Sequence, residues 1–127
     1  MSTIRIAVAS TPLTATLDEA VPAAVAAIDE AARLGARIVC LPETGLPGHR
    51  CQSRHVPEPS EGALGAALSA VADAARRTGV VTIVGAERKT LSGRESVSVV
   101  FSGDGTKLGE QVKDADRPVG GARLRCG

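Results

Sequence analysis

The sequence predicts an α/β fold with the element order β-α-β-α-β-β-β. Short segments rich in Val and Ile alternate with two Ala-rich segments whose apolar residues recur every three or four positions. These are the periodicities of strands and of amphipathic helices. At 127 residues and 43% hydrophobic, with no internal repeat, the chain has the size of one domain that buries a core.

The first strand is expected at residues 4–10, IRIAVAS, where larger residues occupy one face and small ones the other. Such a strand is suited to burial on both sides. The following segment has helical spacing. Thr16 and Glu19 fit a capping box, and Gly35 fits a left-handed C-cap. Pro22 is expected to kink this helix or to delay its start by a turn.

The second strand is expected at residues 36–41, ARIVCL. Because it follows the first strand through a helix, the two should be parallel. A second helix is expected between Ser60, as its cap, and Gly79, as its end. Residues 80–87, VVTIVGAE, then form the third strand.

Residues 88–95, RKTLSGRE, are interpreted as a polar connection. The segment 96–102, SVSVVFS, alternates as a strand does, and GDG at 103–105 is a strong turn signal before TKLGEQVK. These last two segments predict a β-hairpin. Residues 114–127 lose the pattern, so the sequence predicts a structured domain over 1–113 and an irregular tail over 114–127.

Composition excludes several classes of partner. With 15 basic and 14 acidic residues the net charge is +1, and the chain has one Phe, no Tyr and no Trp. Neither a general field for nucleic acid nor an aromatic platform for bases is present. No apolar run is long enough for a membrane helix or follows a basic start. We therefore expect a cytoplasmic protein with no nucleic-acid or membrane partner and no cofactor.

Glu43 is the first candidate for chemistry. It lies in VCLPETGLPGH, directly after the second strand. In open α/β sheets, ligands bind outside the carboxyl ends of parallel strands. Position alone leaves two interpretations open, a solvated or capping carboxylate and a catalytic one. No phosphate-binding glycine loop and no serine nucleophile elbow is present.

The arrangement resembles the N-terminal half of the nitrilase superfamily, the carbon-nitrogen hydrolases. The similarity rests on IRIAVAS, AARLGARIVCLPETGLPGH, ARRTGVVTIVGAERK and SVSVVFSGDGTKLGEQVK, in that order, over about residues 4–113. It implies part of an α-β-β-α sandwich and hydrolysis of a small-molecule amide, nitrile or carbamoyl compound. It also implies that Glu43 is the general base and that Lys113 stabilises the tetrahedral intermediate. A base and a cation are what thiol-based hydrolysis of such a carbon requires.

The resemblance places the nucleophile, a cysteine, several tens of residues after the lysine. Cys126 is the only cysteine after Lys113. The sequence is therefore expected to be truncated or frameshifted relative to that family, and a catalytically incomplete fragment that acts only as an interaction module is the main alternative. An uncovered sheet face would favour self-association or a homo-oligomer.

A second alternative is a zinc site. His49, Cys51 and His55 lie within HRCQSRH, and two imidazoles with a thiolate are good zinc donors. Their spacing is not one of the common structural zinc patterns. We therefore predict no metal ligand and retain Glu43 and Lys113 as the catalytic candidates.

Overall fold

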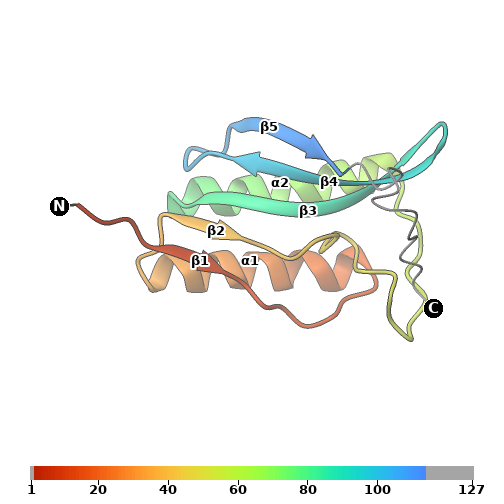
Figure 1. Cartoon of the computed structure of the whole chain (residues 1–127), viewed down its shortest axis with the longest axis horizontal. Helices are drawn as coiled ribbons and strands as arrows, with labels where there is room; N and C mark the ends of the chain where they lie inside the picture. Colours follow the sequence, from red (N-terminus) through yellow and green to blue (C-terminus); the bar gives the residue numbers. More distant parts are fainter. Residues whose placement is uncertain (1, 114–127) are drawn as a thin grey trace, which may run out of the picture.

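The computed structural model describes residues 2–113. One five-stranded sheet, in the order β1-β2-β3-β4-β5, is packed on two helices that lie on the same side of it (Figure 1). The irregular tail predicted for 114–127, with Cys126, lies outside the described residues. The elements are β1 (Ile6–Val8), α1 (Leu17–Arg33), β2 (Ile38–Cys40), α2 (Glu61–Thr78), β3 (Val81–Thr90), β4 (Gly93–Phe101) and β5 (Lys107–Val112).

Strand directions in the sheet follow the predicted order. β1 and β2 are parallel, as are β2 and β3, so the expected βαβ unit is confirmed. β4 is antiparallel to β3, and β5 is antiparallel to β4. After these two reversals β5 runs in the same direction as β3. The chain that leaves β5 therefore lies at the same edge of the sheet as the chain that leaves β2.

Both helices begin at the residues that the sequence indicates, and α2 ends as indicated, whereas the C-cap of α1 is Leu34, with φ −81°, and the left-handed Gly35 follows it. The Thr16 hydroxyl accepts a hydrogen bond from the Glu19 backbone N–H at 3.3 Å, and α1 runs through Pro22 without a delayed start. Pro22 removes a single intrahelical hydrogen bond close to the helix N-terminus, where few are formed. Ser60 caps α2, and Gly79 ends it in the left-handed conformation with φ 74°.

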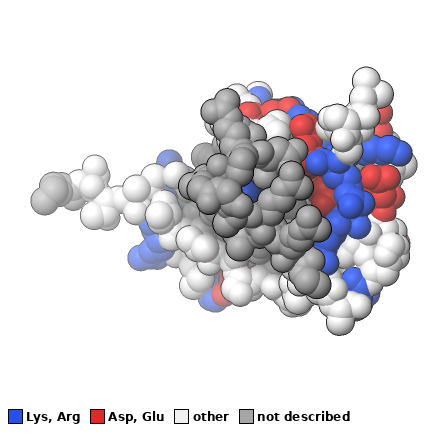
Figure 2. Space-filling view, turned by 45° about the vertical axis from the view of Figure 1, so that its right-hand side comes forward, with Lys and Arg blue, Asp and Glu red and all other residues white. Residues whose placement is uncertain are grey.

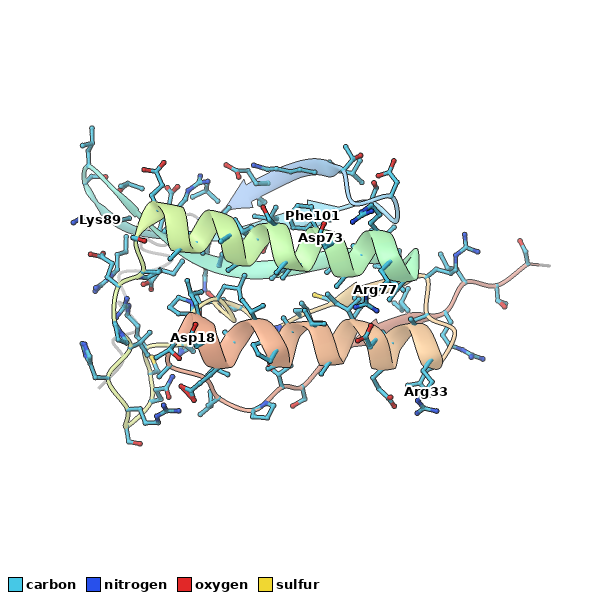
Figure 3. The ribbon with its side chains drawn as sticks, turned by 180° about the vertical axis from the view of Figure 1, so that it is seen from behind. Asp18, Arg33, Asp73, Arg77, Lys89 and Phe101 are labelled. Carbon is cyan, nitrogen blue, oxygen red and sulfur yellow. The ribbon has the colours of Figure 1, made fainter. Side chains whose placement is uncertain are left out.

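The core lies between the helices and one face of the sheet. α1 and α2 pack side by side over this face (Figure 3). Arg77 on α2 forms an ion pair with Asp29 on α1, with a nitrogen–oxygen distance of 2.7 Å. The buried side chains on this face alternate along β3 and β4 with less buried ones, as in a sheet with one packed face. The core includes Ile28, Val39, Val71, Val84, Val97, Val99 and Phe101.

Within residues 2–113 the other face of the sheet carries no helix (Figure 1), and we call it the open face. Ile6 is 63% exposed and Val8 is 83% exposed on β1. The expectation that β1 is buried on both sides is therefore wrong for the described chain. Its small residues Ala7 and Ala9 pack on the core, whereas the larger ones point to the side where residues 2–113 place no second layer.

The expected polar connection over 88–95 is also wrong. β3 extends to Thr90 and β4 starts at Gly93, so these charged residues form the end of a long hairpin. Ion pairs compensate for their polarity: the Arg88 guanidinium contacts Glu95 at 2.5 Å and Glu110 at 2.9 Å. Hydrogen bonds to Glu95 and then to Glu110 raise the pKa of Arg88. Opposite charges paired across strands support a strand where the sequence pattern indicates a loop.

Candidate functional site

Glu43 lies in a short excursion from the strand ladder. Beyond β2 the Leu41 N–H still donates to the Ile83 carbonyl of β3 at 2.9 Å. The chain then leaves the ladder for four residues, which we call the 42–45 turn. Leu46 returns to β3: its N–H donates to the Gly85 carbonyl at 3.0 Å, and its carbonyl accepts from the Glu87 N–H at 2.9 Å. The ladder therefore holds this turn at both of its ends.

Lys113 reaches the same place from the end of β5, two strands away from β3 in the sheet. Its backbone N–H donates to the Ser96 carbonyl of β4 at 2.8 Å, which continues the β5 pairing by one residue. Its Nζ donates to Glu43 Oε1 at 2.6 Å. The structure thus joins the two candidate residues, 70 positions apart in sequence, in one ion pair. The Lys113 side chain is 60% exposed and the Glu43 side chain 47% exposed.

The chemistry available to this pair follows from its charges. A carboxylate can accept a proton from a nucleophile or a water molecule. An ammonium group beside it can stabilise an oxyanion that develops at a carbonyl carbon. Because both groups are accessible from the open face, a small molecule can approach them from that side.

The loop that follows Glu43 is tied to β3 by a second ion pair. Arg50 Nε donates to Glu87 Oε1 at 2.7 Å, and Arg50 Nη1 donates to the Val56 carbonyl. The Glu87 side chain is only 12% exposed. The same loop docks on the segment before α1, where the Thr14 hydroxyl donates to the Pro47 carbonyl at 2.9 Å.

Sequence reasoning did not find Arg50, Glu87 or Gly85 as part of the surroundings of Glu43. A loop arginine and a strand glutamate give no sequence signal that they pair with each other. Gly85 does give one, because a glycine inside an apolar strand often marks a place where another backbone segment comes close. Here that segment is the 42–45 turn.

The cysteine and histidine candidates do not gather around Glu43 as a metal site. His49 Nδ1 accepts a hydrogen bond from the Cys51 backbone N–H at 3.1 Å. Within residues 2–113, no group of three or more His, Cys, Asp or Glu side chains is placed to hold a metal ion. The zinc alternative through His49, Cys51 and His55 therefore has no ligand set in this region. Cys40 is a partly exposed free thiol at the end of β2.

Side chains of both charges lie close together on one part of the molecular surface. In Figure 2, Lys and Arg side chains lie next to Asp and Glu side chains at the right of the view, and they do not form a field of one sign. The exposed pairs include Arg54 with Glu19 at 2.7 Å. The hydrogen bond from Arg54 is the main reason why the pKa of Glu19 is lowered to about 2.

Comparison with known proteins identifies the family. The carbon-nitrogen hydrolase family pattern matches residues 5–115, and the chain belongs to this family. An amidase from Nesterenkonia sp. has a similar structure at TM-score 0.70 and 20% sequence identity, over 88% of this chain and 43% of that one. A mutant of that amidase in complex with butyramide matches at TM-score 0.72 and 19% identity, over 88% and 43%. No match was found among curated proteins.

A larger enzyme also contains this fold. The glutamine-dependent NAD+ synthetase from Acinetobacter baumannii matches at TM-score 0.73 and 19% identity, over 94% of this chain and 23% of that one. The present chain therefore spans less than half the length of each of these proteins. The likeness confirms the predicted nitrilase-type α/β fold. Within residues 2–113, no helix is long and apolar enough to cross a membrane.

Proposed function

We propose that this chain provides the glutamate and lysine of a hydrolase site for non-peptide carbon–nitrogen bonds. Glu43 acts as the general base and Lys113 stabilises the tetrahedral intermediate. The observation that carries the proposal is the 2.6 Å contact between Lys113 Nζ and Glu43 Oε1 at the accessible edge of the sheet. Family membership supports the same reaction class.

The reaction requires a thiol. A nitrile adds this thiol to form a thioimidate, which one water molecule converts to a thioester and ammonia. With an amide, the thiol attacks the carbonyl carbon directly. Glu43 takes the thiol proton, the thiolate bonds to the carbon, and Lys113 faces the negative charge that develops on the former carbonyl oxygen. The leaving amine takes the proton from Glu43. Water, activated by the same carboxylate, then hydrolyses the thioester. The substrate class is a small amide, nitrile or carbamoyl compound, and the setting is the cytoplasm.

Ammonia release from butyramide is the direct assay, because a mutant of the similar amidase is described in complex with this amide. We expect Glu43→Gln to reduce turnover by about 100-fold or more, since a positioned base contributes about 10²–10⁴-fold. Lys113→Met should reduce it by a similar factor. Glu58→Gln, in the same long loop, is the matched control and should leave the rate unchanged. Equal rates for Glu43→Gln and the wild-type chain would contradict the assignment.

Acrylamide labelling can identify the thiol. In a mutant of the Nesterenkonia amidase, acrylamide adds to the active-site cysteine. Mass spectrometry of this chain after incubation with acrylamide will show which cysteine reacts. A label whose rate depends on Lys113 and Glu43 identifies the nucleophile. Slow labelling whose rate does not depend on Lys113 and Glu43 would instead indicate that this chain does not complete a site.

The main alternative is an interaction module without turnover, and the open face favours it. Exposed apolar side chains on a sheet tend to associate with another chain. We propose that copies of this chain associate through the face that carries Ile6 and Val8. If butyramide, a nitrile and a carbamoyl compound all remain intact and Glu43→Gln changes nothing, this alternative holds.

A further inference from the structure

The 42–45 turn crosses β3 at a position where no side chain is present. A Cβ added to Gly85 would lie 2.5 Å from the Pro42 carbonyl oxygen, 2.7 Å from the Thr44 nitrogen and 2.9 Å from the Glu43 Cα. All three atoms belong to the backbone, so no flexible side chain can swing away. Contacts under 3.0 Å require something to shift. The 42–45 turn can therefore pack directly against β3 only because residue 85 has no side chain.

Gly85 is not needed for backbone freedom. Its φ lies outside the positive range that disfavours side chains, and it pairs with Ser98 in the regular β3–β4 ladder. An alanine could adopt the backbone conformation of Gly85 without strain. Only the close approach of the 42–45 turn excludes a side chain at this position.

Thr44 gives a second and independent observation in the same turn. It is the non-glycine residue with positive φ, at 47°, within the described chain. It is buried, and its Oγ1 has no hydrogen-bond partner among residues 2–113. Backbone outliers and unpaired buried hydroxyls are kept where the surrounding structure enforces them, and they cluster at functional sites.

We propose that Gly85 and Thr44 are positioning residues that fix the Glu43 carboxylate against the Lys113 ammonium group. The gap at Gly85 lets the turn approach the sheet, and the left-handed conformation of Thr44 returns the chain to the ladder at Leu46. Glu43, between them, is then held on the side of the sheet from which Lys113 approaches. The positioning of Glu43 against Lys113 does not depend on whether the chain is an active hydrolase. Only the effect of this positioning on catalysis rests on the proposed function.

The test uses the carbon-13 chemical shift of the Glu43 side-chain carboxyl. In the wild-type chain we expect Lys113→Met to change this shift, because the 2.6 Å contact is removed. In a Gly85→Ala background the same Lys113→Met substitution should no longer change it. Gly109→Ala is the matched control: this glycine lies in β5, and a Cβ there meets nothing within 4 Å. Its background should retain the full effect of Lys113→Met.

A second variant acts on the turn and leaves β3 intact. Thr44→Pro forces φ to about −65°, which is incompatible with the observed 47°. It should abolish the effect of Lys113→Met in the same way, even if Gly85→Ala does not fold. Thr44→Gly accepts positive φ and should preserve the effect.

The outcomes separate this proposal from the proposed function. If Lys113→Met still changes the Glu43 shift in both Gly85→Ala and Thr44→Pro, the positioning role is wrong. If the effect is lost as expected and the wild-type chain hydrolyses no amide, the positioning role stands and the hydrolase proposal fails. Where turnover is present, Gly85→Ala should lower kcat much more than it raises KM. A displacement of about 1 Å at a reacting group can reduce rates by roughly 100-fold.

Discussion

The two faces of the sheet differ in what their side chains do. The helix-covered face buries apolar residues from every layer, such as Ile28 of α1 at 0% exposure and Val39 of β2 at 0%. The open face holds Glu43 and Lys113 and leaves Val8 83% exposed. Stability therefore resides on one face and the candidate chemistry on the other. Substitutions on each face should affect different measurements.

The largest expected effect is on the covered face. Ile28→Ala removes a fully buried side chain and should lower the free energy of unfolding by about 2–5 kcal/mol, since it combines lost burial with a cavity. Ile6→Ala on the open face should change it by about 0.5 kcal/mol or less. Chemical denaturation of both variants measures the difference. Equal losses would show that the open face is also packed in solution.

The second prediction concerns association. Replacing Ile6 and Val8 by lysine should shift the chain from self-associated forms to the monomer, because it places charge on the exposed apolar face. Light scattering coupled to size-exclusion chromatography measures the mass. Leu91→Lys is the control, since this exposed apolar residue lies at the tip of the β3–β4 hairpin. A wild-type chain that is a sharply melting monomer would contradict the proposed self-association.

Much of the fold and the two candidate site residues could be predicted from the sequence. Helical periodicity and caps at Thr16, Ser60 and Gly79 located both helices, because capping chemistry is local. Glu43 and Lys113 were chosen by family resemblance, and the ladder explains their meeting: β2 and β5 run in the same direction. The long hairpin over 88–95 was missed because Arg88 is stabilised by partners on other strands. Gly85 inside an apolar strand is a signal that another backbone segment comes close, but it does not say which segment, so its contact with the 42–45 turn was not predicted.

A smaller effect is expected when the ion pair of the site is neutralised. Glu43→Gln should change the free energy of unfolding by at most about 1 kcal/mol, because both side chains are substantially exposed and such pairs contribute little. The same variant should strongly reduce hydrolysis. Thermal denaturation and the ammonia assay, carried out on one preparation, measure the change in stability and the change in hydrolysis. A large loss of stability would mean that the pair supports the fold.

The smallest effect concerns the link between the long loop and the helix layer. The hydrogen bond from Arg54 lowers the pKa of Glu19 from 4.5 to about 2. A lowered carboxyl pKa stabilises the folded state above about pH 4.5, and this contribution is lost as the pH falls towards 2. Arg54→Met should therefore move the Glu19 midpoint in an NMR titration back towards 4.5. Arg76→Met, which removes a cation from the exposed pair with Asp73, should leave the midpoint where it is.

The separation of 70 residues between Glu43 and Lys113 has a consequence for the order of folding. The β3–β4 and β4–β5 hairpins can form from contacts that are close in sequence, whereas this ion pair also requires the distant strand β2 to be paired with β3. Closing so long a loop costs chain entropy that a single exposed contact does not repay. The pair should therefore be among the last contacts made during refolding and among the first lost during unfolding. Its formation reports that the sheet is complete.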